Sequence, residues 1–388
     1  MPRSGNSRQH STPSWDASST RSRERERKMD KVKTSATVAG DAARRHRATG
    51  LTVAVLGLGG IGAVAAGYLQ AAGRNRIIAC ARQPLERIVI ERSHEELAVQ
   101  LQAITDPKDA GPADWVLLAT KAHQTLSVAP WLARLCHRST RVAVLQNGVR
   151  QVERTAPWIS EATVVPAVVS YSGERVSADR VVLRQPAAFD LAVQADADGR
   201  AFSDLFAGTP LRILISDNLS TLAWRKLLIN SVANPITALT LQRLSVFRRD
   251  DIRALAETML KEAVAVARAD GARVTEDDIS QILGTLRDIP ADMTTSMHLD
   301  RLAGRALELD ALNGAIVAAG ERLGFAVPLN RALLTLLRAA QSEEPMVPRP
   351  DDAGRPDDGA SPAGAPAAFA PDGPLTERNR QTAPAGTA

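Results

Sequence analysis

The sequence is poor in the side chains on which several classes of protein depend. Its 388 residues include 2 cysteines and 6 histidines, and aromatic residues make up 3%. Cys80 and Cys136 form no C-x-x-C pair, and no His-rich cluster or metal-ligand spacing appears, so we expect no metal site. The scarcity of aromatic rings also argues against a stacking platform for single-stranded nucleic acid.

Long apolar runs are missing as well. No run reaches about 18 residues, the usual minimum for a membrane-spanning helix. The first residues are polar and charged, unlike the apolar core of a signal peptide. Both cysteines lie in or beside apolar segments, which favours reduced thiols packed as small apolar side chains. We therefore expect a cytoplasmic protein without a membrane partner.

The net charge of +5 is spread unevenly along the chain. Residues 1–50 hold 12 Lys and Arg against 5 Asp and Glu, whereas residues 342–388 hold 4 against 8. Neither segment has an apolar period, and both are rich in small polar residues or Pro, so we expect two disordered tails. The excess of positive charge comes from residues 1–50, so it does not argue for a nucleic-acid partner of the folded part. The alternative is that this basic arm touches nucleic acid or another protein.

The most informative stretch is residues 51–82, which read LTVAVLGLGGIGAVAAGYLQAAGRNRIIACAR. The pattern predicts a buried strand over 51–56, a helix over 63–72 that ends at Gly73, and a second strand over 77–81. Between the first strand and the helix lies a G-x-G-x-x-G motif, made of Gly57, Leu58, Gly59, Gly60, Ile61 and Gly62. This context favours a dinucleotide-binding turn over a glycine-rich turn that binds nothing.

Each glycine of the motif has a physical role in such a turn. Gly57 allows the tight turn, Gly59 lets the backbone approach a pyrophosphate, and Gly62 lets the helix pack close to the strand with its positive end toward the phosphates. The residue after the second strand indicates which dinucleotide binds. It is Arg82, which suits the 2′-phosphate of NADP, where an NAD site has Asp or Glu. The alternative is a solvated surface arginine.

Further strands and helices alternate along the next hundred residues. We expect a short strand over 97–101, buried strands over 113–120 and 141–145, and a helix over 125–136 between them. Strands over 163–170 and 180–183 would form an antiparallel extension, and strands over 187–193 and 211–215 would complete the sheet. Alternation of this kind predicts a parallel sheet with ligands at the carboxyl ends of the strands. Lys121 and Asn147 lie at two such ends, although Asn147-Gly148 on its own would predict a hairpin turn.

From Ser220 onward the patterns are helical only. Lys226, Asn230 and Asn234 are spaced four residues apart, so they form one polar stripe on an otherwise apolar helix over 221–241. A buried stripe needs partners, and the alternative is a stripe that faces bulk water. Pro235 predicts a kink beside Asn234. Further helices are expected over 251–270, from Thr275 onward and over 329–340.

Together these patterns predict an α/β fold. An N-terminal Rossmann dinucleotide-binding domain over 51–218 is followed by an all-helical C-terminal domain over 219–341, with a tail on either side.

The ordered set of motifs resembles the ketopantoate reductase (2-dehydropantoate 2-reductase) family from residue 51 to about residue 340. The matching motifs are GLGGIG at 57–62, Arg82 after the second strand, Lys121 in TKA, Asn147 in QNG, the series Lys226, Asn230 and Asn234 followed by Pro, Ser296 in TSM, and Glu308 in LELDALNG. The resemblance implies a Rossmann domain that binds NADPH, a helical domain, and a substrate cleft between them. It also implies reduction of ketopantoate to pantoate on the route to pantothenate and coenzyme A.

Residue by residue, the resemblance implies a cofactor site and a substrate site. NADPH would be contacted by residues 57–62, Arg82, Lys121, Asn147 and Glu308. The 2-keto acid would be held by Asn147, Lys226, Asn230, Asn234 and Ser296. Lys226 would donate the proton, with Glu308 beside it as the second catalytic residue. A homodimer is compatible with the resemblance, which does not fix the oligomeric state.

The chemistry explains why a lysine is suited to this role. Hydride addition builds negative charge on the ketone oxygen, which a cationic proton donor both stabilises and neutralises. Free lysine titrates near ~10.4, burial lowers that pKa, and a neighbouring Glu308 would raise it. Neutral asparagines hold a keto acid without adding a competing charge.

Two departures from the family pattern keep other substrates open. Leu307 and Leu309 replace the Thr and Ile that usually flank the glutamate, and Leu307 would remove a hydroxyl beside the site. The segment over 171–179, YSGERVSAD, also differs from the family's usual stretch. The alternatives are an NADP-dependent reductase of a different 2-keto acid and a non-catalytic NADP(H)-binding regulator.

Overall fold

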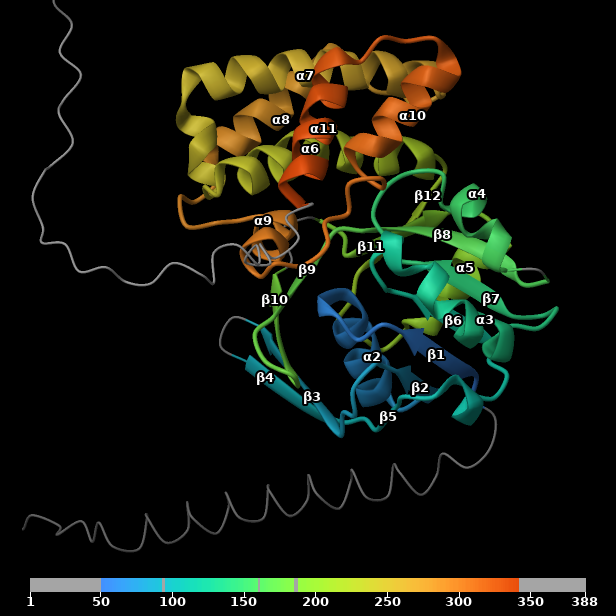
Figure 1. Ribbon diagram of the computed structural model, residues 1–388. Helices are drawn as coiled ribbons and strands as arrows, with labels where there is room; N and C mark the ends of the chain where they lie inside the picture. The colour runs from blue at the N-terminus through green and yellow to red at the C-terminus, as the bar shows by residue number, and fades with distance from the viewer. Residues whose placement is uncertain (1–49, 93–94, 160, 185–187, 342–388) are drawn as a thin grey trace, which may run out of the picture. The chain divides into compact units, whose positions relative to one another are not determined.

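The computed structural model describes residues 50–341 except 93–94, 160 and 185–187, so both expected tails lie outside the described residues. The described strands form two sheets (Figure 1). The larger sheet has eight strands, in the order β12 (Ile213–Ser216), β11 (Leu191–Gln194), β8 (Thr163–Val169), β7 (Arg141–Val144), β6 (Trp115–Leu118), β1 (Thr52–Leu56), β2 (Arg76–Cys80) and β5 (Ala103–Ile104).

The larger sheet is mainly parallel, as the alternation of strands and helices predicts. All neighbours from β8 to β5 pair in parallel, and β11 is antiparallel to β8 and parallel to β12. Side chains of β1, β6 and β7 alternate between two apolar cores, so that Val53 and Val55 point into one and Ala54 and Leu56 into the other. Burial on both faces is typical of parallel sheets.

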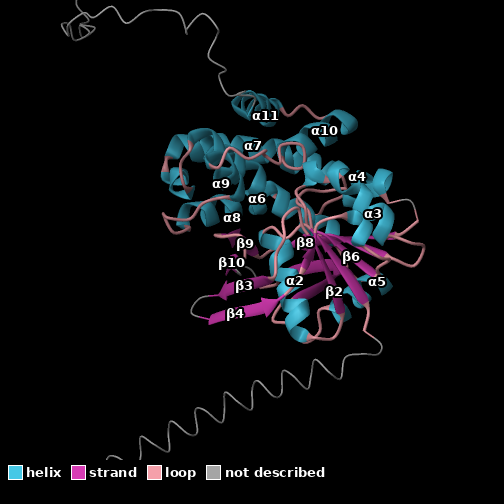
Figure 2. Cartoon of the chain, turned by 60° about the horizontal axis from the view of Figure 1, so that its bottom comes forward, coloured by secondary structure: helices cyan, strands magenta, loops and turns pink. Residues whose placement is uncertain are grey.

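Helices cover both faces of this sheet, and Figure 2 shows its strands fanning out between them. The first core contains α2 (Gly60–Ala72) and α5 (Ala197–Leu205), and the second contains α3 (Ala129–Leu135). The shorter turns of helix are α4 (Gln151–Thr155), η1 (Pro107–Asp109), η2 (Ala122–Gln124), η3 (Leu126–Val128) and η4 (Ala156–Trp158). The helix predicted over 125–136 is therefore divided between η3 and α3.

The second sheet is a feature that the sequence patterns did not predict. Its order is β4 (Glu95–Gln100), β3 (Arg87–Arg92), β10 (Arg180–Arg184) and β9 (Ser172–Arg175). The strand predicted over 180–183 is β10, but it pairs in parallel with β3 and does not extend the main sheet, so that part of the prediction is wrong. The sheet packs on α2, where Ile88 and Ile90 lie against Gly67, which has no side chain. Side-chain packing between segments about 90 residues apart decided this pairing.

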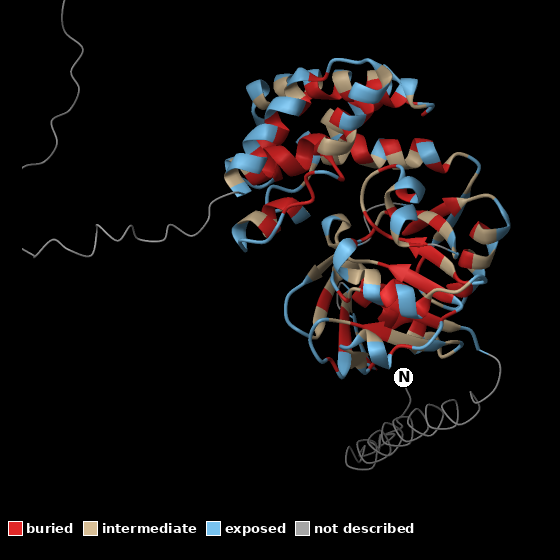
Figure 3. Ribbon diagram, turned by 45° about the vertical axis from the view of Figure 1, so that its right-hand side comes forward, coloured by how far each residue is buried: buried red, intermediate tan, exposed pale blue. Residues whose placement is uncertain are grey.

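The helical region contains α6 (Leu219–Thr240), η5 (Leu244–Arg248), α7 (Asp250–Ala269), α8 (Glu276–Asp288), α9 (Ser296–Leu302), α10 (Asn313–Leu323) and α11 (Pro328–Gln341). Its long helices share one apolar core, and Figure 3 shows their buried stripes facing one another. The helix α6 contacts β8 and β11 as well as α7, α9 and α11. It therefore links the helical region directly to the larger sheet.

Pro235 lies inside α6, which continues as one helix from Leu219 to Thr240. Because proline has no N–H, it leaves the carbonyl of Ser231, four residues earlier, without its helical donor. Asn313 Nδ2 donates to that carbonyl at 2.9 Å, and the same amide donates to Asn330 Oδ1 at 3.1 Å. A side chain from α10 thus replaces the hydrogen bond that the proline removes.

Cys80 and Cys136 are free thiols, and burial raises the pKa of Cys80 to about 12 and that of Cys136 to about 11. Both pack in the core beside α3, as small apolar side chains do. Among the described residues, no helix has the length and apolar character needed to span a membrane.

Candidate active site

The glycine turn between β1 and α2 has the geometry that its sequence predicts. Gly57 has a φ of 92°, and a Cβ on it would lie 2.7 Å from the Thr120 side chain. A Cβ on Gly62 would lie 1.9 Å from the Gly57 carbonyl oxygen, so α2 packs directly on the turn. Gly59, the N-cap of α2, has open space where its Cβ would be. The first turn of α2 has no acidic residue, so its positive end is free to bind phosphate.

These features fit a dinucleotide. The open space at Gly59 would be filled by any other side chain, and it lies where the backbone of such turns approaches a pyrophosphate.

Three neighbouring strands contribute polar groups at their carboxyl ends, on the same edge as the glycine turn. Lys121 follows β6, Asn147 follows β7, and the carbonyl of Val169 ends β8. Asn147 is not in a hairpin, because β7 is parallel to both of its neighbours, so the hairpin alternative is wrong. Gly148 has a φ of 93°, and a Cβ on it would lie 2.4 Å from the Ala311 carbonyl oxygen. This glycine lets the loop after β7 approach the segment that holds Glu308.

Lys226 reaches this edge from α6. Its Nζ donates to Asn147 Oδ1 at 3.0 Å and to the Val169 carbonyl. At Lys226, therefore, the polar stripe meets partners and does not face bulk water. Burial lowers the pKa of Lys226 to about 8, and the negative charge of Glu308 opposes that shift without cancelling it. The result is an ammonium group that loses its proton near pH 8.

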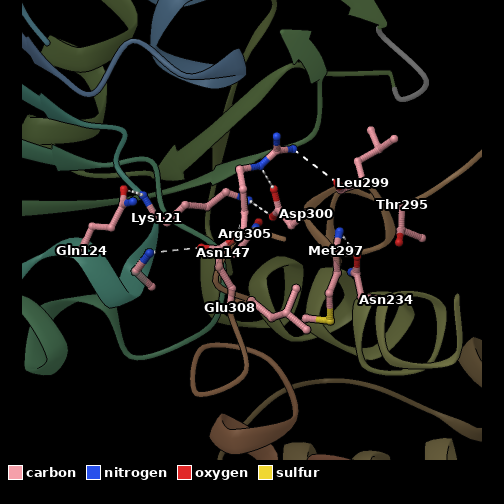
Figure 4. A network of polar contacts seen from close by, with 12 residues as sticks. Lys121, Gln124, Asn147, Asn234, Thr295, Met297, Leu299, Asp300, Arg305 and Glu308 are labelled. Carbon is pink, nitrogen blue, oxygen red and sulfur yellow. Dashed lines mark hydrogen bonds and ion pairs between the residues drawn. The ribbon is translucent and has the colours of Figure 1, made fainter. Parts of the chain in front are cut away.

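Glu308 is the centre of the polar network in Figure 4. It accepts from Lys121 Nζ, from the backbone N–H of Ala122 and from Asn147 Nδ2, each at 3.1 Å. Burial alone would raise the pKa of Glu308, but Lys121 and these hydrogen bonds hold it below its usual range. The prediction that Glu308 lies beside Lys226 differs from the structure, where Asn147 bridges the two side chains. The direct ion-pair partner of Glu308 is Lys121, because the loop that holds Glu308 packs on the turn after β6.

Asp300 is a charged member of the network that sequence reasoning missed. Its carboxylate accepts from Lys121 Nζ at 3.0 Å and from Arg305 Nε at 2.9 Å, and its side chain is 8% exposed. Burial lowers the pKa of Lys121, but Glu308 and Asp300 outweigh it and raise the pKa above the ordinary value. The available signal was the spacing of Asp300 four residues after Ser296 on one short helix. Arg154, whose Nη2 donates to the Asn147 carbonyl at 2.9 Å, was also missed.

The other polar residues of α6 lie along the same helix face. Asn230 lines a pocket together with Lys226, Asn147 and the end of β8. Asn234 is buried, and its Oδ1 accepts from the backbone N–H of Met297 at 3.4 Å. Ser296, the first residue of α9, is exposed and adjacent to that contact. The stripe therefore runs from the sheet edge to the start of α9.

The predictions for Arg82 and Leu307 have different outcomes in the structure. Arg82 is exposed, two residues after the end of β2, and has no ion-pair partner among the described residues, which fits both a 2′-phosphate contact and a solvated arginine. The sequence predicts that Leu307, in place of Thr, removes a hydroxyl beside the site, whereas the Leu307 side chain packs in the apolar core of the helical region.

Taken together, the arrangement combines two capabilities on one edge of the sheet. The glycine turn offers a cradle for phosphate, and at the same edge of the sheet a lysine with a pKa of about 8 faces an asparagine and a carbonyl. The second group can donate a proton to a developing oxyanion. Such a pairing is suited to hydride transfer with coupled protonation.

Comparisons with known proteins cover both regions. The model of the family described as "Ketopantoate reductase PanE/ApbA" matches residues 53–195, and that of its C-terminal part matches residues 218–341. The 2-dehydropantoate 2-reductase of Mycobacterium tuberculosis is 40% identical over 290 residues, which cover 74% of this chain and 97% of the relative. That of Caulobacter vibrioides is 34% identical over 289 residues, which cover 74% and 99%. A dimeric ketopantoate reductase from Staphylococcus aureus has a similar structure, with a TM-score of 0.68, 29% identity, and coverage of 75% and 99%.

Proposed function

The chain belongs to the ketopantoate reductase family, and from this membership we propose that it reduces the ketone of 2-dehydropantoate to the hydroxyl of pantoate with NADPH. The chain is thus an oxidoreductase that acts on CH–OH groups. The observation that carries the proposal is the position of Lys226, whose ammonium group contacts Asn147 at the same sheet edge as the glycine turn.

We assign the two regions separate tasks within this proposal. The sheet region over 51–218 would bind the cofactor, and the helical region over 219–341 would supply most substrate contacts. The product would enter pantothenate and coenzyme A synthesis in the cytoplasm, a compartment that the two free thiols support. A homodimer is the assembly to test, since the ketopantoate reductase from Staphylococcus aureus, whose structure is similar to that of this chain, is dimeric.

The proposed mechanism assigns one role to each group. Bound NADPH would supply the hydride that adds to the ketone carbon. Lys226 would point its ammonium at the ketone oxygen, stabilise the growing negative charge and donate a proton. Asn147 would fix the lysine through its Oδ1 and Glu308 through its Nδ2, so that one amide couples the two charges. Glu308 would keep Lys121 in place at the carboxyl end of β6.

The remaining contacts would hold the rest of the substrate. Asn230 would contact the substrate from the pocket that it lines together with Lys226. Asn234 and Ser296 would contact the substrate from further along α6 and from the start of α9. Amide and hydroxyl groups can donate to a carboxylate and accept from a hydroxyl, the two polar ends that a keto acid of this kind presents.

The test of substrate is a comparison of 2-keto acids. Purified protein is given NADPH and either ketopantoate, pyruvate or 2-ketoisovalerate, and NADPH absorbance reports turnover. We expect the highest kcat/KM with ketopantoate, because only this substrate offers a hydroxyl group to the polar stripe. Higher kcat/KM with another keto acid would assign a different substrate, and binding of NADPH without turnover of any keto acid would contradict catalysis.

The alkaline limb of the pH profile should report Lys226. A proton donor is active in its charged form, which exists below its pKa, and burial lowers that pKa to about 8. The rate of ketone reduction at saturating substrate is therefore expected to be level at lower pH and to fall as the pH rises through about 8. A fall in rate centred near pH ~10.4, where free lysine titrates, would show that Lys226 is not buried as described. The affinity for NADPH, measured over the same range, is the control.

Arg82→Ala should change cofactor preference. A guanidinium that binds the 2′-phosphate matters for NADPH and has no matching group on NADH. We therefore expect KM for NADPH to rise about tenfold or more while KM for NADH changes little, since a charge-assisted phosphate contact is among the stronger hydrogen bonds. Equal changes in the two KM values would contradict a 2′-phosphate contact.

A further inference from the structure

The segment that departs from the family pattern packs directly on the glycine turn. Gly173 of β9 meets Gly60 backbone to backbone, so that a Cβ on Gly60 would lie 1.7 Å from the Gly173 carbonyl oxygen. Tyr171 Oη donates to the Ile61 carbonyl at 2.7 Å, and Arg175 Nη1 donates to the Leu58 carbonyl. Figure 2 shows β9 and β10 beside α2. The second sheet therefore brings a cation to the turn.

The charge of Arg175 has no carboxylate partner at ion-pair distance in the described part of the chain. Its three hydrogen bonds go to the carbonyls of Leu58, Ser177 and Ala178. Asp179, the acid whose charge acts on Arg175, is paired with Arg87 at 2.7 Å. A guanidinium carries five N–H donors, so both terminal nitrogens keep a donor for a further acceptor.

This cation lies beside another positive charge. The N-terminal end of α2 carries about half a positive charge, and no acidic residue in its first turn neutralises it. A guanidinium against a helix N-terminus is unfavourable on its own, and an anion between the two relieves the repulsion. Arg175 is exposed, so a ligand can reach it.

We propose that Arg175 is a further cofactor-binding residue, which binds a phosphate group of the dinucleotide together with the glycine turn. The inference rests on the proposed function, since it assumes that a dinucleotide binds at this turn. Arginine recognises phosphate through two parallel N–H donors, which matches the free donors on both terminal nitrogens. The phosphate is either the pyrophosphate at the turn or the 2′-phosphate toward Arg82, and NADH, which lacks the latter, distinguishes them.

The test measures the dissociation constants of NADPH and NADH by calorimetry for the wild type and three variants of the full chain. Arg175→Gln removes the charge but keeps an amide that can donate to the Leu58 carbonyl, and Arg175→Lys keeps the charge without the planar fork. Arg76→Ala removes a charge from an exposed arginine at the opposite, amino-terminal end of β2. Thermal midpoints of all variants report whether the turn still folds.

We expect Arg175→Gln to weaken NADPH binding about tenfold or more, Arg175→Lys to restore part of the loss, and Arg76→Ala to bind as the wild type does. A similar loss for NADH assigns the pyrophosphate, and a loss for NADPH alone assigns the 2′-phosphate. Wild-type affinity in Arg175→Gln, or an equal loss in Arg76→Ala, would overturn the proposal while leaving the proposed function intact. A wild-type protein that binds neither dinucleotide would instead refute the proposed function, and this inference with it.

Discussion

Lys226→Ala is expected to lower kcat for ketone reduction about 100-fold or more, the range for a positioned general acid. The ammonium group would both stabilise the oxyanion and supply its proton, and alanine can do neither. Binding of NADPH should change little, because the contacts of Lys226 are with Asn147 and the Val169 carbonyl and not with the glycine turn. Steady-state kinetics and calorimetric titration with NADPH measure the two effects separately.

The matched control is Lys261→Ala on α7, which removes a lysine that is exposed and paired with Glu257 one helical turn away. An exposed pair of this kind contributes little, so the control should keep wild-type kcat. Near-normal turnover by a folded Lys226→Ala protein would exclude this lysine as the proton donor.

Glu308→Gln should have the second large effect, through the neighbours of the glutamate. The substitution removes the negative charge that holds Lys121 and replaces one of the two acceptor oxygens with an –NH2 group. Either the Ala122 N–H, or Lys121 Nζ and Asn147 Nδ2, then lose their acceptor. Because the charge of Glu308 raises the pKa of Lys226, its loss should lower that pKa further. We expect kcat/KM to fall about 100-fold, as for loss of one positioned electrostatic group, and the alkaline limb to move to lower pH.

Asp300→Asn is the control for the pH shift. It also removes a negative charge from Lys121, but Asp300 is not among the charges that act on Lys226. The alkaline limb should therefore stay near pH 8 in this variant. Identical alkaline limbs for wild type and Glu308→Gln would show that the charge of Glu308 does not raise the pKa of Lys226.

Several site positions could be predicted from short stretches of sequence. Lys121 and Asn147 directly follow apolar runs, and the carboxyl ends of neighbouring parallel strands meet at one edge of a sheet. Lys226, Asn230 and Asn234 share a helix face because they are four residues apart. In each case the relevant geometry depends on residues close together in the chain.

Other features could not be predicted in this way. Glu308 is 187 residues from Lys121 and 161 from Asn147, and its partners depend on how the loop before α10 packs against the sheet edge. The strand β10 was predicted, but its partner β3 was not, since both parallel and antiparallel placements satisfy the same apolar pattern. Gly173 and Arg175 carried no signal of contact with Gly60 and Leu58, more than 110 residues earlier.

Neighbouring residues along the chain are enough to establish the local geometry, namely the glycine turn between strand and helix, the polar groups at strand ends, and the polar stripe of α6. Backbone conformation and side-chain periodicity follow from residues within a few positions of one another, so short patterns suffice for them. The contacts of the charged groups, in contrast, are known only from the folded chain: Glu308 with Lys121, Lys226 with Asn147, and Arg175 with the glycine turn. Those contacts depend on the packing of whole elements, which no spacing within one element specifies.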